Sequence, residues 1–318
     1  MDIVAKTKKD IKGVKIQGAT AVAKSVVSCL KIYAKQLEAD DIETFKKKLK
    51  RAASELLLLR PTEPLAKNAC KFLFWQISKE RDAKKIKNKF IKAADDFLRI
   101  LSSAREKISV LGAKLVSGGD NVFTHCHSSL VEASFVRAKR QGKKFNVFNT
   151  ETRPLFQGHI TAKNLLRNKI PVTMVTDSSA EFLISRHSGK ELMMDKVFIG
   201  SDAILKNGSC INKIGSFGIG MAAFSEKVPL YIITSLLKFA DSSWVEIEKR
   251  PAKEVWRGAP NELRIINFAF DVIPEKFISG LVCEAGIIKP NLAKAKVKEI
   301  YPWILENKNK NKNKEYGF

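Results

Sequence analysis

A cysteine lies between two histidines in the segment FTHCHSS, residues 123–129. Its thiol could bind a metal ion, attack as a nucleophile, act as an acid–base catalyst, or fill the core as a small apolar group. A metal ion is disfavoured, because adjacent strand residues point to opposite faces and no second Cys/His cluster has ligand spacing. A hydrolytic nucleophile is disfavoured because neither His125 nor His127 lies in a nucleophile-elbow context. On this segment alone, acid–base catalysis by Cys126 and a structural thiol both stay open.

Short β-rich runs follow one another in the second part of the chain. They are NVFTHC (121–126), FNVFNTE (145–151), VTMVTD (172–177), KVFIGSDAI (196–204), LYIITS (230–235) and GLVCEAGII (280–288). Helix-like segments such as 130–140 and 215–226 separate them, which predicts βαβ units. The runs are apolar on both faces, as in a sheet covered by helices. We therefore expect an α/β fold with a mainly parallel, doubly wound sheet.

The ends of these runs carry polar and reactive side chains, as in THCHSS, NTETRP, VTDSSA and IGSDA. In a doubly wound sheet the ligand binds outside the carboxyl ends of the strands. The pattern therefore predicts that several of these side chains converge on one rim of the sheet. They are Cys126, Glu151, Asp177, Asp202 and Lys238.

The stretch GSDAILKNGSCINKIGSFGIGMAAF, residues 200–224, suggests an anion site. A strand ends near Asp202, a hairpin-like connection follows around Asn207 and Gly208, and NKIGSFGIG then opens a helix. Backbone N–H groups at a helix N-terminus, with Lys213 beside them, can bind phosphate. The alternative is a glycine-rich turn that packs this helix closely on the sheet.

Residues before Gly119 show helical periodicity instead of strand periodicity. Apolar residues recur at helical spacing over 19–39, over 42–59 up to Pro61, and over about 87–116. These patterns predict a helical bundle domain over 1–117 and a Rossmann-like α/β domain over 118–303. The remainder, 304–318, is a low-complexity basic tail that we expect to be disordered.

The composition is strongly basic, with 57 Lys+Arg against 33 Asp+Glu and a net charge of +24. Nucleic-acid binding, an anionic small substrate and a merely solvated basic surface each fit this charge. Because no helix-turn-helix, zinc-finger or RNP motif accompanies it, nucleic acid is the partner we least expect. The N-terminus lacks an apolar signal region, no run is long enough for a membrane span, and the five cysteines are scattered. These features predict a cytoplasmic protein with reduced thiols and no membrane partner.

Five segments together resemble one known family: THCHS, TETRPLFQGHITA, VTDSSA, GSDAILKNGSCINKIG and NFAFDVIPEKFISGLVCEAGII. The family joins the regulatory α, β and δ subunits of translation initiation factor two-B to two sugar-phosphate isomerases. One isomerase acts on methylthioribose 1-phosphate and the other on ribose 1,5-bisphosphate. The similarity covers roughly residues 10–303, and THCHS and NTETRP are most similar to the archaeal ribose-1,5-bisphosphate isomerases.

The resemblance implies an aldose–ketose isomerase that forms ribulose 1,5-bisphosphate in AMP salvage. It implies a catalytic pair in which Asp202, with a raised pKa, is the acid and Cys126, as a thiolate favoured by nearby cations, is the base. No metal and no redox cofactor are required. The substrate-binding positions implied by the family are Gln17, Gly18, Ala19, Thr20, Arg60, His127, Ser128, Ser129, Asn212, Lys213 and Lys238.

Three positions depart from the family pattern. Gln17 replaces the arginine of RGAG, Ser129 replaces the lysine that follows THCHS, and Ser201 replaces an alanine. The first two changes remove cations from a bisphosphate site. The alternative to an isomerase is therefore a non-catalytic regulatory subunit that binds a sugar phosphate or nucleotide and contacts translation factor two. Either reading implies a homo-oligomer, a dimer or a hexamer.

Overall fold

A computed structural model describes residues 2–13, 15–16, 18–38, 41–60 and 62–306. Gln17, Pro61 and residues 307–318 of the predicted tail lie outside these ranges. At the start of the predicted tail, Ile304 is buried in the core. The division into domains over 1–117 and 118–303 stays a prediction.

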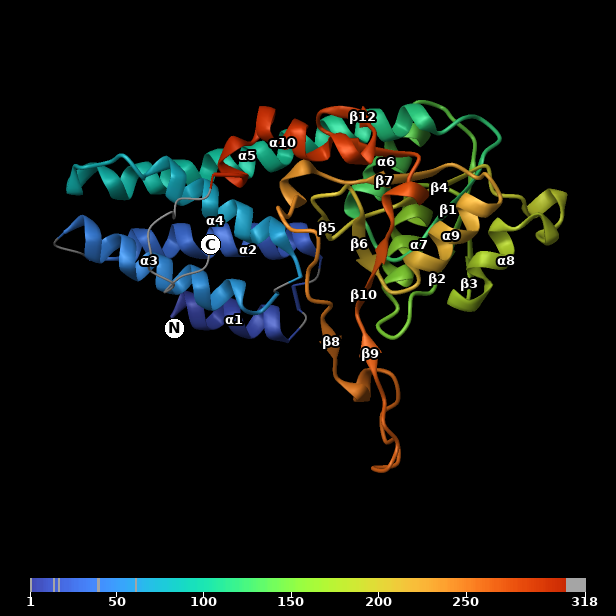
Figure 1. Ribbon diagram of the computed structural model, residues 1–318, viewed down its shortest axis with the longest axis horizontal. Helices are drawn as coiled ribbons and strands as arrows, with labels where there is room; N and C mark the ends of the chain where they lie inside the picture. Colours follow the sequence, from blue (N-terminus) through green and yellow to red (C-terminus); the bar gives the residue numbers. More distant parts are fainter. Residues whose placement is uncertain (1, 14, 17, 39–40, 61, 307–318) are drawn as a thin grey trace.

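Helices form the first part of the chain and lie side by side at one end of the molecule (Figure 1). They are α1 (Ile3–Lys12), α2 (Ala19–Gln36), α3 (Ile42–Leu57), α4 (Pro64–Gln76) and α5 (Ala83–Leu115). The apolar stripe of α2 is buried, and Val26 and Leu30 are fully covered. Asp41 caps α3 by accepting a hydrogen bond from the Thr44 N–H at 2.8 Å. The three predicted helices are confirmed, while α1 and α4 had not been singled out.

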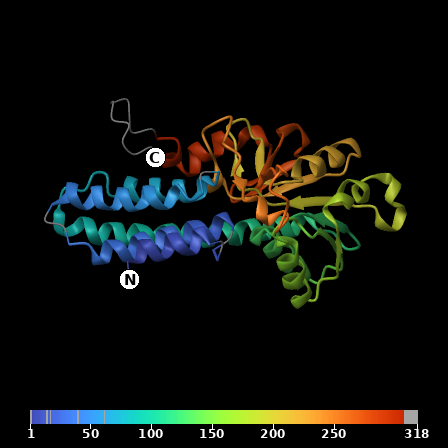
Figure 2. The same ribbon diagram turned by 90° about the horizontal axis from the view of Figure 1, so that it is seen from below.

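The long helix α5 belongs to both parts of the structure. Its first half packs on α2 and α4, and its second half packs on α6 (Ser129–Arg140) and on the sheet. Ile108 of α5 is fully buried in the same apolar cluster as Phe135 and Phe198, which come from α6 and β4. A single rigid helix therefore connects the helical part to the sheet (Figures 1 and 2).

A seven-stranded sheet forms the centre of the second part, in the order β12-β11-β7-β4-β1-β2-β3. Its strands are β1 (Asn121–Thr124), β2 (Asn146–Thr150), β3 (Val172–Val175), β4 (Lys196–Ile199), β7 (Leu230–Ile233), β11 (Gly280–Cys283) and β12 (Gly286–Ile288). All neighbours pair in parallel except β11 and β12. The predicted mainly parallel, Rossmann-like sheet is confirmed.

Helices cover both faces of this sheet. They include α7 (Gln157–Arg167), α8 (Ala180–Ile184), α9 (Ser216–Ser225) and α10 (Ala293–Ile300). In Figure 2 the green segments around α6 and α7 lie on one side, and the amber and red segments that include α9 and α10 lie on the other. The chain thus buries strands β1, β4 and β7 almost completely, as their apolar sequences require.

Three predicted runs differ from the structure. The run 196–204 is two strands, because the chain turns at Gly200 and continues as β5 (Ala203–Ile204) in another sheet. The run 280–288 is an antiparallel hairpin that turns at Glu284 and Ala285, and the φ of 122° at Gly286, which follows the turn, lies in the region that favours glycine. The β3 strand lies at the sheet edge, so Thr173 and Met174 are exposed and the expected burial of both faces is wrong there.

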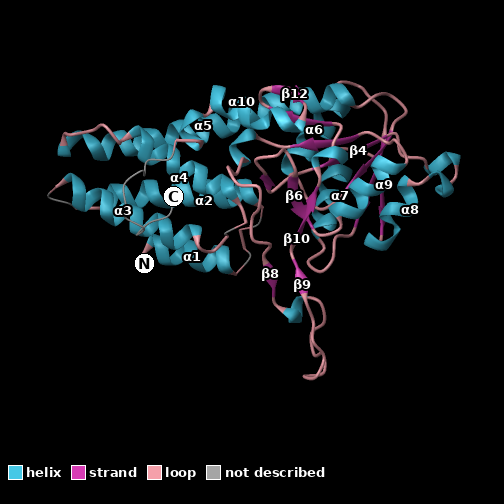
Figure 3. Ribbon diagram, viewed as in Figure 1, coloured by secondary structure: helices cyan, strands magenta, loops and turns pink. Residues whose placement is uncertain are grey.

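A small antiparallel sheet and a projecting arm extend from the main sheet (Figure 3). The small sheet is β10-β6-β5, with β6 (Cys210–Lys213) and β10 (Phe270–Ile273). The arm contains the paired strands β8 (Lys249–Arg250) and β9 (Asn267–Phe268). In the described part of the chain, no helix is both long and apolar enough to cross a membrane.

Candidate active site

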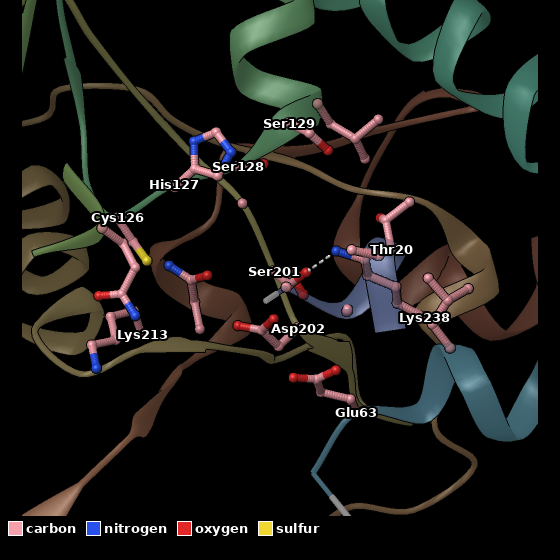
Figure 4. Close-up of a pocket in the computed structure, with 18 of the residues that line it drawn as sticks. Thr20, Glu63, Cys126, His127, Ser128, Ser129, Ser201, Asp202, Lys213 and Lys238 are labelled. Atoms are coloured by element: carbon pink, nitrogen blue, oxygen red, sulfur yellow. Dashed lines mark hydrogen bonds between the residues drawn. The ribbon is translucent and has the colours of Figure 1, made fainter. Parts of the chain in front are cut away.

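A pocket of about 450 Å³ lies where the helical part meets the carboxyl ends of β1 and β4. Apart from Gln17, which lies outside the described residues, every site residue implied by the family resemblance lines it, and Figure 4 draws many of them. They are Gly18, Ala19, Thr20, Arg60, Cys126, His127, Ser128, Ser129, Asp202, Asn212, Lys213 and Lys238. Six separate segments of the chain thus contribute these residues to one site.

Cys126 lies two residues after the end of β1, in a backbone conformation that positions its thiol at the pocket. Its φ is 67°, in the left-handed region, and its N–H donates to Thr152 Oγ1 at 3.0 Å. Its carbonyl accepts a hydrogen bond from Thr161 Oγ1 at 2.9 Å. Cys126 is half-buried, whereas the other four cysteines, all within the described residues, are buried. The Cys126 thiol is therefore more accessible than the other four and lies at the wall of the pocket.

The charge state of Cys126 differs from the one expected. Burial and the nearby Asp202 carboxylate raise the pKa of the Cys126 thiol to about 12, and the opposing effect of Lys213 is smaller. The expectation of a depressed thiol pKa is wrong for this arrangement, because a thiolate in the pocket meets poor solvation and a neighbouring negative charge.

The two histidines of the segment have different surroundings. His125 is buried, and its ring joins Thr150 Oγ1 at 2.6 Å and the Ile214 carbonyl at 2.9 Å. Burial lowers its pKa to about 4, so it is a neutral structural ring. His127 lines the pocket and its Nδ1 lies 3.1 Å from Thr161 Oγ1. Among the described residues, no group of three or more His, Cys, Asp or Glu side chains could hold a metal ion.

The predicted rim is correct for three of its five members. Cys126, Asp202 and Lys238 line the pocket, whereas Glu151 and Asp177 do not. The Asp177 carboxylate instead accepts hydrogen bonds from the N–H groups of residues 152 and 153, at 2.8 and 2.6 Å. It therefore holds the loop after β2 that supports Cys126, one layer behind the pocket.

Asp202 follows the tight turn at the end of β4. A Cβ on Gly200 would lie 2.7 Å from Ser128 Cβ, so only glycine lets this turn approach the start of α6. Burial in the pocket raises the pKa of the Asp202 carboxyl, against the opposing pull of Lys238, Arg60 and Lys213. The expected direction of this shift agrees with the structure, and the carboxyl is suited to donate a proton.

Two buried lysines and one arginine supply positive charge in the pocket. Lys213 and Lys238 are 6% and 7% exposed. The Lys238 ammonium donates to the Ser201 carbonyl, and Lys213 makes no ion pair with any described residue. Arg60 Nη1 lies 3.3 Å from both carboxylate oxygens of Glu248, so its charge is already balanced. Lys213 is therefore the buried cation best placed to meet an anionic ligand.

The anion site expected at the start of α9 is occupied by the protein itself. The Asp271 carboxylate accepts hydrogen bonds from the N–H groups of Gly215 and Phe217, at 2.8 and 3.1 Å. The helix N-termini that line the pocket include those of α2, α4, α6 and α7. The α2 terminus has no side-chain cap, and Gly18 precedes it with φ 82°. The N–H groups of α9 that were expected to bind an anion thus already have a partner, although Lys213 itself lines the pocket.

Several charged residues of the pocket were missed by sequence reasoning. Lys24 and Arg105 line it beside Thr20 and Ser129, and Glu63 lines it near Asp202. Lys24 follows Thr20 by one helical turn, so its position could have been found from the i, i+4 spacing. Arg105 comes from α5, and no local pattern links that helix to the carboxyl ends of the strands.

Comparisons with known proteins place this geometry in a family. A family model described as the Initiation factor 2 subunit family matches residues 15–290. A ribose 1,5-bisphosphate isomerase of Methanocaldococcus jannaschii is 34% identical over 96% of this chain and 97% of that protein. One of Thermococcus kodakarensis is 36% identical over 93% and 94%. A solved structure titled translation initiation factor eIF-2B, from Pyrococcus horikoshii, superposes with a TM-score of 0.78 at 25% identity, covering 90% of this chain and 97% of that one. The chain belongs to the Initiation factor 2 subunit family.

Proposed function

We propose that this protein is an aldose–ketose isomerase that converts ribose 1,5-bisphosphate to ribulose 1,5-bisphosphate in AMP salvage. The observation that carries the proposal is one pocket lined by a thiol, a carboxyl with a raised pKa and a buried, unpaired lysine: Cys126, Asp202 and Lys213. The similarity to two relatives named ribose 1,5-bisphosphate isomerase over nearly the whole chain supports this substrate.

The reaction needs an acid and a base on the same sugar. Phosphate on the first carbon blocks simple ring opening, so Asp202 gives its proton to the ring oxygen as the bond from that oxygen to the first carbon breaks. Cys126, as a thiolate, takes the proton from the second carbon, and an enol forms. That proton returns to the first carbon while the second carbon's hydroxyl proton goes to Asp202, which leaves the ketose. No group is consumed, so both residues end in their starting states.

The thiol must lose its proton before it can act. The Asp202 carboxylate is one of the causes that raise the thiol pKa, whereas Lys213 lowers it. A proton on Asp202 removes that negative charge, while the hydrogen bond from the His127 N–H and the charge of Lys213 still lower the thiol pKa. The protonated acid and the thiolate base are therefore mutually favourable, and the active form is the one with the proton on the carboxyl.

Cations from several segments line the pocket and offer positive charge to two phosphates. The N-termini of α2 and α6 line it together with Lys24 and Arg105, neither of which makes an ion pair with a described residue. Figure 4 shows Lys213 and Lys238 on opposite sides of Asp202. Lys24 and Arg105 offer the cations that the family pattern carries at positions 17 and 129. A bisphosphate matches this distribution better than a monophosphate.

A regulatory subunit of translation initiation factor two-B type is the second candidate. The superposition on a protein titled translation initiation factor eIF-2B and the serine at position 129 favour it. In that case the pocket binds a sugar phosphate or nucleotide without turnover, and the protein contacts translation factor two. For either function we propose a homo-oligomer, a dimer or a hexamer, and light scattering of the purified protein measures its size.

An NMR assay tests the proposed reaction. Purified protein is mixed with ribose 1,5-bisphosphate carrying ¹³C at the second carbon, and the isomerase produces a ketone carbon signal. Methylthioribose 1-phosphate is the comparison substrate and should react much more slowly. Cys126→Ser and Asp202→Asn should each lose at least about a thousandfold in turnover while still binding substrate, since groups that act as one unit fail together. Cys29→Ser, a buried thiol of α2 away from the pocket, is the matched control and should turn over normally.

Absence of the ketone signal with the wild-type protein, together with tight binding of the bisphosphate by calorimetry, would move the assignment to the regulatory candidate. Full turnover by Cys126→Ser would contradict the thiol mechanism.

A further inference from the structure

Glu63 is a buried acid of the pocket that the reaction above leaves without a role. It precedes α4 at the N-cap position, yet its side chain makes no capping hydrogen bond. The residue is 5% exposed, and its Oε2 atom is buried without a hydrogen-bond partner among the described residues. A buried carboxyl oxygen without a hydrogen-bond partner destabilises the folded state. Its presence at the wall of a pocket therefore indicates a functional role.

The charged groups that face Glu63 come from four segments. They are Asp202 after β4, Arg60 after α3, Lys238 after β7, and Glu248 before β8. Both cations have other partners, because Arg60 lies 3.3 Å from Glu248 and the Lys238 ammonium donates to the Ser201 carbonyl. Figure 4 shows the Glu63 and Asp202 side chains in the same part of the pocket, away from Cys126.

We propose that Glu63 and Asp202 share a single proton, which makes Glu63 a positioning residue that keeps the acid of the site protonated near neutral pH. The inference rests on the proposed isomerase function and extends it. Two carboxylates in a poorly solvated site repel one another, and the pair loses its last proton at a higher pH than a lone carboxyl would. This repulsion matters for the protonation of Asp202, because Lys238, Arg60 and Lys213 each lower its pKa.

The negative charge of Asp202 acts on Glu63, as expected for two carboxyls in one part of the pocket. Burial, and then the charge of Asp202, raise the pKa of Glu63 to about 7, against the opposing effects of Arg60 and Lys238. The pair therefore still holds a proton in the pH range where a cell works. Since the charge of Asp202 also raises the pKa of the Cys126 thiol, a shared proton favours the thiolate as well.

The pH dependence of turnover tests the role. Glu63→Gln keeps the shape of the side chain and removes its negative charge. The active form pairs a protonated acid with a thiolate, and the acid loses its proton at a lower pH than the thiol does, so the acid sets the lower limb of the kcat profile. In Glu63→Gln that limb should move down by about one pH unit or more, and the plateau above it should fall about tenfold. KM should change less than about twofold, as Glu63 does not hold a phosphate. Glu63→Asp retains a carboxyl and should restore most of the limb.

Three outcomes of this profile would overturn the inference. A limb that stays in place in Glu63→Gln would show that Asp202 does not depend on Glu63. A large rise in KM at every pH would show that Glu63 contacts the sugar directly. A lower melting temperature with an unchanged profile would show a structural role only.

A titration without turnover separates this inference from the proposed reaction. With ¹³C at glutamate side-chain carboxyls, the Glu63 signal is assigned by its loss in Glu63→Gln. In Asp202→Asn, the Glu63 signal should titrate at least about one pH unit lower than in the wild-type protein. An unchanged titration refutes the shared proton even if the protein is an active isomerase. A shifted titration in a protein that does not isomerise ribose 1,5-bisphosphate leaves the pair standing and rejects only the reaction. If Glu63→Gln fails to fold, the Glu63 signal can be assigned with Glu63→Asp instead. The titration of Glu63 in Asp202→Asn then still tests the shared proton.

Discussion

Alkylation of Cys126 measures the electrostatics of the pocket directly. Burial and Asp202 raise the thiol pKa from an ordinary value of 9.0 to about 12. At pH 7 a thiol with the ordinary pKa is about 1% ionised, whereas this one is ionised in roughly one molecule in 100,000. Since only the thiolate reacts, the ligand-free protein should be alkylated at Cys126 roughly a thousandfold more slowly than an exposed cysteine.

The assay is iodoacetamide labelling of the folded protein, with peptide mass spectrometry to assign the modified residue. The pH dependence separates ionisation from access. The logarithm of the rate at Cys126 should rise by about one per pH unit, without a plateau, from about pH 7 to pH 10. Two variants move the rate in opposite directions: Asp202→Asn removes a negative neighbour and should speed labelling, while Lys213→Met removes a positive one and should slow it. The other four cysteines are buried and provide an internal measure of unfolding.

A plateau below about pH 9 would refute the argument, because it would mean that the thiol ionises at or below its ordinary pKa. Equal labelling rates in the two variants would show that solvent access, and not charge, controls this cysteine.

Three further results follow from the pocket and its supports. Lys24→Ala and Arg105→Ala should each raise KM for the bisphosphate about tenfold with little change in kcat, measured by steady-state kinetics. Gly158→Ala, at the start of α7, should lower the melting temperature and turnover together, because the new Cβ would lie 1.8 Å from the Thr150 carbonyl oxygen. Burial raises the pKa of Asp271 from 3.8 to about 6, so the folded state holds more protons in that range and loses stability as pH rises from about 4 through 6. Asp271→Asn should remove that part of the decline in a comparison of thermal unfolding curves.

The sequence predicted the elements with a strong local pattern. The α2, α3 and α5 helices carry apolar residues at helical spacing, and the parallel strands are apolar runs between helices. The breaks inside runs were missed because the turn after Gly200 depends on the approach of Ser128, and nothing beside Gly200 in the sequence reveals that neighbour. Hydrophobicity also could not distinguish the β3 edge strand from the central ones, since burial there depends on strand order.

The site was predictable where residue type decides the chemistry and unpredictable where packing decides it. Cys126 and Asp202 were found from strand ends and from the family resemblance, and both line the pocket. The N-terminus of α9 could not be recognised as occupied, because its partner Asp271 lies more than fifty residues away in the chain and reaches α9 through the β10–β6 pairing. The raised thiol pKa was missed because it follows from burial, which the sequence does not give. Glu63 looked like an ordinary residue before a helix.

The backbone conformation of Cys126 affects which residues are expected at position 126 during evolution. A non-glycine residue with φ near 67° carries a strain of about 1–2 kcal/mol, which glycine avoids and asparagine tolerates better. Stability alone would thus replace this cysteine by glycine or asparagine under random mutation. If Cys126 is the proposed base, selection for proton transfer opposes that replacement. In a lineage that gave up turnover for regulation, position 126 should be among the first to lose its original residue, which makes it a marker for sorting relatives by activity.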